Sequence, residues 1–283
     1  MEEKNMCSHR ENTTKEVFFK WFIFSAALFG LGLLTAFYPL HGNIPFIIIP
    51  SVLVLIFCKP VSFERMKLST LLVMRILVVL AALHILPGEW YINIVLVFLV
   101  INIGEATFTD IFKYKKYYNG ISGIAVGIGV LVLNGTWLYD APIGEYYLAQ
   151  STAVIATVCY IVAYTLWNWL FVTHEFSPSV ALMHVGFLLV PILGSIATLE
   201  MGVFGGFGLW LLLRANTLSI GGWLQIGIKD WFEHDFAHPG FAKFVKAMNS
   251  TKAEIICMVI NLGLIGVALY YGLATGWLSF LFN

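Results

Sequence analysis

The sequence predicts an all-α integral membrane protein in which about nine hydrophobic helices cross a bilayer as a polytopic bundle. Hydrophobic residues make up 59% of the 283 positions and charged residues only 11%, with a mean hydropathy of +0.85. Soluble domains carry about 25% charged residues, because water solvates their whole surface. Lipid is therefore expected to cover much of this surface, and helices satisfy their backbone hydrogen bonds there.

The helices are expected where apolar runs of about 20 residues recur, the length that crosses about 30 Å of hydrocarbon. The segment with Pro45 and Pro50 is shorter, which leaves a re-entrant or tilted segment as its alternative. Because the connections are short, residues 1–283 are expected to form a single membrane domain. The predicted spans are 17–38, 43–58, 68–86, 90–110, 119–138, 148–172, 178–198, 203–226 and 254–281.

The distribution of Lys and Arg predicts the orientation, because these residues collect on the cytosolic side of membrane proteins. They occupy the segment 1–16 and the connections after the second, fourth and eighth spans, whereas the alternate connections carry acids such as Asp140 and Glu200. This alternation predicts a cytosolic tail over 1–16, an outer C-terminus and location in the cell membrane. No cleavable signal is evident in 1–16, so the first helix is expected to remain.

The segment 227–253 mixes aromatic and charged residues and is predicted to lie at the cytosolic interface as an amphipathic helix, interrupted at Pro239. His234 and His238 are four residues apart, a spacing with which one helix can present two ligands to a divalent or transition metal. A helix without metal is the alternative, and Pro239 favours it because the residue before a proline avoids helical geometry. No other cofactor is indicated.

Polar side chains inside the spans are functional candidates, because an ionisable group at mid-membrane costs about 3 kcal/mol on insertion scales. In the fourth span Asn102 and Glu105 share one helical face. In the sixth span Trp167 and His174 flank a polar stripe formed by Thr157, Tyr160, Tyr164, Asn168 and Glu175. Such faces are expected to meet protein or a cavity rather than lipid.

Arg75, His184 and Arg214 add polar groups to the third, seventh and eighth spans. With a cytosolic N-terminus, these groups lie in the cytosolic half of the membrane or near its middle. The one-sided distribution predicts a polar cavity open to the cytosol. As structural alternatives, Arg75 extends to the lipid head groups, His184 is a hydrogen-bonded core histidine, and Arg214 forms an ion pair with Glu105.

These residues predict a membrane-embedded enzyme whose substrate is hydrophobic or lipid-like with an anionic head group. The expected catalytic residues are Glu105, His174, Glu175 and His184, as groups that move protons. The expected substrate-binding residues are Arg75, Asn102, Tyr164, Trp167, Asn168 and Arg214. A small-molecule transporter with the same pocket is one alternative, and a non-catalytic scaffold or receptor is another.

The expected partners are membrane lipids and a small hydrophobic or anionic ligand. The chain holds 16 basic and 16 acidic residues, which argues against a nucleic-acid partner because such proteins carry a basic excess. The sequence leaves the oligomeric state open.

Overall fold

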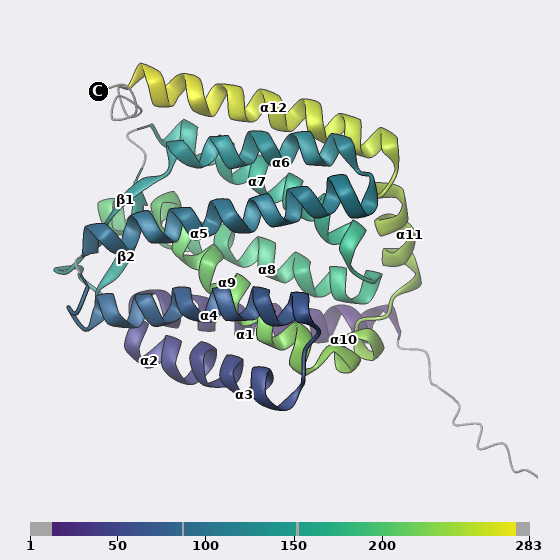
Figure 1. Cartoon of the computed structure of the whole chain (residues 1–283), viewed down its shortest axis with the longest axis horizontal. Coiled ribbons are helices and arrows are strands. Elements are labelled where there is room, and N and C mark those ends of the chain that lie inside the picture. The colour runs from purple at the N-terminus through teal and green to yellow at the C-terminus, as the bar shows by residue number, and fades with distance from the viewer. Residues whose placement is uncertain (1–12, 87, 151–152, 276–283) are drawn as a thin grey trace, which may run out of the picture.

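The computed structural model describes residues 13–86, 88–150 and 153–275, and its long helices run side by side between the same two ends (Figure 1). This arrangement confirms the predicted all-α membrane bundle. The helices are α1 (Thr14–Phe37), α2 (Pro39–Asn43), α3 (Ile49–Phe57), α4 (Ser62–Ala82), α5 (Gly88–Phe108), α6 (Tyr117–Gly129), α7 (Val154–Glu175), α8 (Pro178–Ala197), α9 (Trp210–Gly227), α10 (Lys229–Asp235), α11 (Pro239–Met248) and α12 (Thr251–Ala274).

Six helical segments within the described residues are long and apolar enough to cross a membrane. They are Thr14–Phe37, Pro39–Phe57, Ile94–Tyr114, Val154–Glu175, Pro178–Ala197 and Thr251–Ala274. The second joins α2 to α3 through a π-helical turn over Ile44–Ile48, so this proline-containing segment is one continuous helical run. The total of nine spans and the cytosolic N-terminus stay predictions.

Helix starts at one end of the bundle are fixed by side-chain caps, which satisfy backbone N–H groups that have no helical partner. Thr13 Oγ1 accepts from the Glu16 N–H at 3.3 Å before α1. Ser177 Oγ accepts from the Val180 N–H at 3.3 Å before α8, and Pro178 occupies the first helical position.

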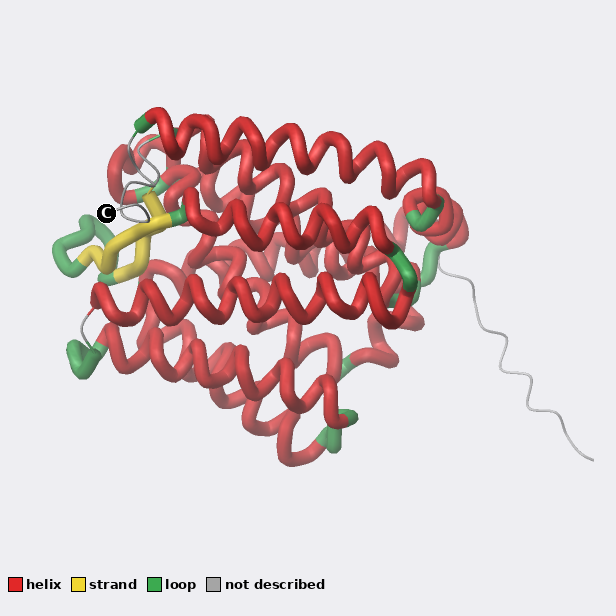
Figure 2. Tube along the Cα trace, turned by 45° about the horizontal axis from the view of Figure 1, so that its top comes forward, coloured by secondary structure: helices red, strands yellow, loops and turns green. Residues whose placement is uncertain are grey.

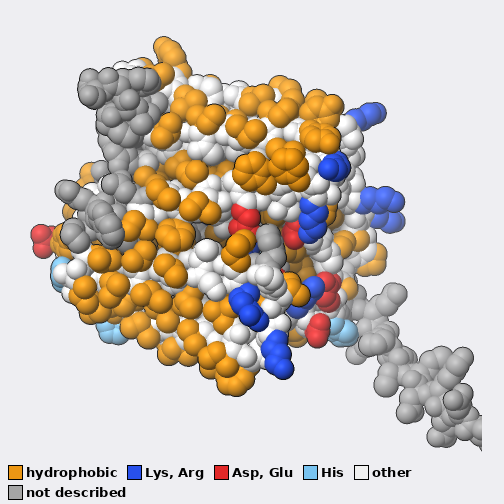
Figure 3. All heavy atoms as spheres, viewed as in Figure 1, with side chains coloured by type: hydrophobic (Ala, Val, Ile, Leu, Met, Phe, Trp, Pro, Cys, Tyr) orange, Lys and Arg blue, Asp and Glu red, His pale blue; other side chains and the backbone are white. Residues whose placement is uncertain are grey.

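Apolar side chains cover the outside of the bundle (Figure 3). Phe19 and Phe22 on α1 and Ile256 and Val259 on α12 are each more than half exposed. Since α9 is surrounded by other helices and buries most of its side chains, its polar residues face protein rather than this surface. The exposed apolar belt is what a lipid-facing surface requires.

A β-hairpin replaces helix at the boundary of the fifth and sixth predicted spans, so the boundaries 119–138 and 148–172 were wrong. Helix ends at Val132, and β1 (Asn134–Leu138) pairs antiparallel with β2 (Tyr146–Gln150), with Gly135 opposite Ala149. The connecting loop packs against α1 at Gly144 (φ +65°), where a Cβ would lie 1.6 Å from the Phe37 carbonyl oxygen. The hairpin lies at the end of the bundle opposite the start of α1 (Figure 2).

The eighth predicted span, 203–226, begins later than its apolar composition suggests. Residues 199–209 form 3₁₀ turns, and α9 starts only at Trp210. Gly202 and Gly206 have φ values of +59° and +66°, a left-handed conformation that interrupts a helix.

Basic residues gather at the other end of the bundle, where α1 begins and α10 and α11 lie (Figures 1 and 3). Lys20 pairs with Asp235, and Lys116 Nζ lies 2.6 Å from Glu254 Oε1. The connections that carry Lys and Arg are predicted to lie on one side of the membrane, and in the structure they lie next to one another. The segment 227–253 forms two helices, and its place at a membrane interface stays a prediction.

Cysteine accessibility tests the orientation. In a chain whose natural cysteines are replaced, Asp140→Cys lies beside the hairpin and Lys243→Cys on α11, and both positions are exposed. A membrane-impermeant maleimide is expected to label Asp140→Cys on intact cells and Lys243→Cys only after lysis. The reverse pattern would invert the topology.

Candidate functional site

Pro191, within α8, leaves one carbonyl of that helix without its usual partner. Proline has no N–H, so the carbonyl of Phe187, four residues earlier, loses its helical hydrogen bond. Two side chains of α9 occupy this acceptor: the Thr217 hydroxyl at 3.2 Å and Arg214 Nη1 at 3.5 Å. The proline in α8 thus helps to determine where the Arg214 guanidinium lies.

Arg214 is only 2% exposed, and its closest partners are neutral. Nη2 donates to Asn168 Oδ1 at 3.1 Å, and the guanidinium lies 5.6 Å from the centre of the Tyr164 ring. Its Nε has no hydrogen-bond partner among the described residues, and none of their ion pairs includes Arg214. A buried guanidinium without a counter-charge is costly, so this position favours a bound anion.

Arg214 lines a cavity of about 320 Å³ between α4, α7, α8 and α9. That volume lies at the lower end of small-molecule sites, which span about 300–1,000 Å³. The lining extends from Arg214 to Glu64, Lys229 and Glu233 at the basic end of the bundle. The cavity therefore lies in the half of the bundle that the sequence predicts to be cytosolic.

Two carboxylates at the rim of this cavity have hydrogen-bond partners other than Arg214. Glu64 Oε2 accepts from the Val61 N–H at 3.3 Å, in the first turn of α4. Glu233 Oε2 accepts from the Ser177 hydroxyl at 2.7 Å. Neither carboxylate is paired with Arg214.

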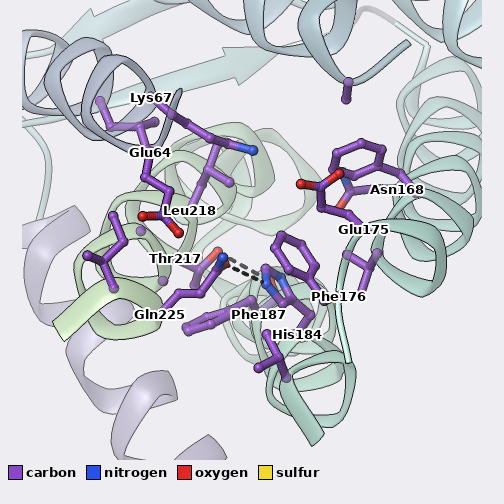
Figure 4. A pocket seen from close by; sticks show the side chains of 18 of the residues that line it. Glu64, Lys67, Asn168, Glu175, Phe176, His184, Phe187, Thr217, Leu218 and Gln225 are labelled. Carbon is purple, nitrogen blue, oxygen red and sulfur yellow. Dashed lines mark hydrogen bonds between the residues drawn. The ribbon is translucent and has the colours of Figure 1, made fainter. Parts of the chain in front are cut away.

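Lys67 and Glu175 extend toward one another from opposite walls of the cavity (Figure 4). Glu175 Oε2 lies 3.4 Å from Lys113 Nζ, whereas Lys67 is in none of the ion pairs of the described residues. Lys67 Nζ lies 5.6 Å from the centre of the Phe171 ring. Lys67 and Arg214 thus both line the cavity, and neither is in an ion pair of the described residues.

His184 adds a titratable group to the same cavity. Its Nε2 lies 3.1 Å from Gln225 Oε1, and its ring stacks on Phe176 with centroids 4.7 Å apart and planes at 10° (Figure 4). Because Gln225 Oε1 accepts a hydrogen bond, Nε2 carries the proton in neutral His184 and Nδ1 is left as an acceptor. Nδ1 can therefore accept a hydrogen bond.

A second cavity of about 160 Å³ adjoins the first beneath α4 and α5. The two cavities share Leu71, Asn102, Arg214 and Leu218 as lining residues. Most of the other residues around the second cavity are apolar, among them Met74, Phe98, Leu99 and Leu211. Arg214 therefore stands between a polar cavity and an apolar one.

The structure brings most of the predicted site residues to these two cavities. Asn102, Asn168, Glu175, His184 and Arg214 line the larger one. Glu105 and Tyr164 line the smaller one together with Asn102 and Arg214. The polar faces of the fourth and sixth predicted spans thus converge.

Glu105 shares a cavity with Arg214 but forms no ion pair with it, so the structural ion pair considered for these residues is absent among the described residues. Glu105 Oε1 is buried and has no hydrogen-bond partner in that part of the chain. Both charged side chains therefore line the smaller cavity without being paired with each other.

Arg75 and Trp167 line neither cavity, which corrects their assignment as substrate-binding residues. Arg75 is fully buried and donates from Nη1 to Asn216 Oδ1, so it does not extend to the head groups either. Asn216 follows Arg214 by two residues and points to the opposite side of α9. Trp167 packs on α6, where a Cβ on Gly123 would lie 2.6 Å from its Nε1.

His174 lies in a separate buried polar cluster and not at the cavity, which corrects its place in the predicted catalytic set. Its Nδ1 is 3.0 Å from Asp110 Oδ1, and its Nε2 is 3.9 Å from Glu254 Oε1. Lys116 Nζ lies 2.6 Å from the same Glu254 oxygen, and Asn119 donates to Asp110 Oδ2 at 2.5 Å. The cluster ties together the ends of α5, α6, α7 and α12 and explains His174 as a structural residue.

His234 and His238 do not share a helical face, which removes the basis of the predicted metal site. α10 ends at Asp235, and His238 is extended (φ −144°) as the N-cap of α11. Its Nδ1 accepts from the Phe241 N–H at 2.9 Å, and its Nε2 lies 3.0 Å from Thr14 Oγ1. Within the described ranges no group of three His, Cys, Asp or Glu residues is arranged to hold a metal ion.

Sequence reasoning missed Lys67, Thr217 and Gln225, which all line the larger cavity. Lys67 lies immediately before the predicted span 68–86, among the basic residues of a connection that the alternation predicts to be cytosolic. Thr217 follows Arg214 by three residues, and this helical spacing was the available signal.

In comparisons with protein-family models, curated proteins and solved structures, nothing matches this chain. The candidate site therefore rests on its own geometry.

A double-mutant cycle tests the cluster around His174. His174→Gln and Asp110→Asn are each expected to lower the free energy of unfolding by about 3–5 kcal/mol, because each leaves a buried polar partner uncompensated. The double variant should lose less than the sum of the singles by about 0.5–3 kcal/mol in denaturation in detergent.

His234→Gln is the matched control for that cycle, because the His234 side chain is 58% exposed at the same end of the bundle. It should change the free energy of unfolding by less than about 0.5 kcal/mol. Additive losses at His174 and Asp110 would show that the two side chains are not coupled.

Proposed function

We propose that this protein is a membrane-embedded enzyme that acts on an amphiphile with an anionic head group. The observation that carries the proposal is Arg214, which is 2% exposed, lies in no ion pair of the described residues and lines both cavities. An anionic group at this point would supply the missing counter-charge. Charge-assisted hydrogen bonds to a guanidinium are among the strongest a protein makes.

The head group is expected to lie between Arg214 and Lys67. Asn168 and the Phe187 carbonyl each accept a hydrogen bond from one guanidinium nitrogen of Arg214, and its buried Nε has no partner among the described residues. Lys67 adds a second positive charge to the same cavity. The polar rim with Glu64 and Lys229 lets water reach this part of the cavity.

Proton transfer is assigned to Glu175, with His184 as the second titratable group. Glu175 lines the cavity, and its Oε2 lies 3.4 Å from Lys113 Nζ. His184 offers an acceptor at Nδ1 in the same cavity. General acid–base catalysis needs such groups within reach of the substrate, and this supports an enzyme over a binding protein.

A transporter is the second candidate, and Pro191 is the feature that favours it. A helix broken by proline beside a substrate site is a recurrent element of alternating-access proteins. A transporter would use Arg214 and Lys67 in the same way but would leave the ligand chemically unchanged.

Ligand binding tests the anion site directly. Arg214→Gln is expected to weaken the binding of decyl phosphate by at least about 30-fold, because removal of one partner of a buried charge pair costs about 2 kcal/mol or more. Calorimetry in phosphatidylcholine nanodiscs measures this, with Lys243→Gln as an exposed-cation control that should stay within about twofold. Equal affinity of the Arg214 variant and the unaltered protein would refute the anion site.

Turnover separates the enzyme from the transporter. Glu175→Gln is expected to retain decyl phosphate binding but to lower turnover by about 10²- to 10⁴-fold, the usual contribution of a general acid or base. Mass spectrometry of lipid extracts from cells that express either form should reveal a product that only the unaltered protein makes. A ligand that is redistributed across the membrane without covalent change would assign the protein to transport.

A further inference from the structure

The second cavity lies beneath the boundary between α4 and α5 at the side of the bundle. Its outer lining includes Met66 on α4 and Ile101 on α5, which are 53% and 54% exposed on the apolar surface. A space-filling view perpendicular to the helices shows the surface hollowed between α4 and α5, with acidic side chains inside the hollow (Figure 3). The hollow opens on the side of the bundle, toward the end where Lys and Arg side chains gather (Figure 3).

The inner end of this cavity meets the anion site. Leu71, Asn102, Arg214 and Leu218 line both cavities, so the two cavities meet at these four side chains. On the way from the lipid-facing edge to Arg214 the walls are formed mainly by Met74, Phe98, Leu99 and Leu211. The walls therefore suit a hydrocarbon chain, and the inner end suits a negative charge.

We propose that the substrate is a bilayer lipid that enters sideways between α4 and α5, with one hydrocarbon chain in the smaller cavity and its anionic head group on Arg214. This inference rests on the proposed function and adds its route and substrate class. Each methylene that leaves water contributes about 0.8 kcal/mol, but a lipid chain is already out of water in the bilayer. The charge at Arg214 therefore supplies the attraction, and the apolar cavity selects the ligand that can reach it.

The smaller cavity has a depth-limiting residue that allows a selective test. Ala215 on α9 is 8% exposed and lines this cavity alone. Ala215→Phe would fill space that the chain needs while leaving the larger cavity and its lining unchanged. Ala27→Phe makes the same substitution at an exposed position of α1 and is the matched control.

Two anionic compounds of different chain length distinguish the chain from the head group. In phosphatidylcholine nanodiscs, Ala215→Phe is expected to weaken dodecyl phosphate binding at least tenfold and to leave butyl phosphate binding within twofold. Arg214→Gln is expected to weaken both. Ala27→Phe should change neither. If Ala215→Phe weakens both compounds equally or neither, the chain site is wrong while the anion site stands; if Arg214→Gln changes neither, the proposed function fails.

Photolabelling supplies a readout that does not depend on the folding of a variant. Dodecyl phosphate with a diazirine near the end of its chain should label α4 and α5 around Met66 and Ile101 in the unaltered protein. An excess of unlabelled dodecyl phosphate should suppress this labelling at least tenfold. Labelling spread evenly over the lipid-facing helices, without suppression, would overturn the sideways route.

Discussion

The contact between the Phe187 carbonyl on α8 and Arg214 on α9 is the interaction on which the rest of the site depends. Pro191 removes the N–H that would occupy this carbonyl, and Arg214 and Thr217 take its place at 3.5 Å and 3.2 Å. The same contact joins two central helices and sets the position of a buried cation. The carbonyl that Pro191 leaves free thereby holds the Arg214 guanidinium between a polar and an apolar cavity.

Two buried arginines in this bundle differ in their surroundings, and the difference separates a structural arginine from a candidate binding residue. Arg75 is enclosed with Asn216 away from both cavities, whereas Arg214 lines both cavities and its buried Nε has no partner in the described part of the chain. Because an uncompensated charge in low dielectric is expensive, a protein retains one where a ligand completes it. The cluster of Asp110, His174 and Glu254 shows the opposite case, in which opposite charges satisfy one another.

Hydropathy was enough to predict the helical membrane bundle, because a helix that crosses a membrane needs a long run of apolar residues, and such runs are visible in the sequence. The polar face with Tyr164 and Asn168 likewise predicted a wall of the cavities, because helical spacing fixes a shared face. The hairpin at 134–150 was missed, because its two five-residue strands lie at the ends of long apolar runs and hydropathy alone does not separate them from those runs. The positions of His174 and Arg75 relative to the cavity depend on which helices are neighbours, and a single sequence does not contain that information.

A density map of the protein purified from its membrane tests the central claim most directly, because it reveals what completes Arg214. The account predicts elongated density in both cavities, with the head group in contact with the Arg214 guanidinium and the chain between α4 and α5. A carboxylate of the protein in direct contact with Arg214, such as Glu105, would contradict it. In that arrangement the buried cation would be a structural ion pair, and the proposed ligand would have no charge to bind.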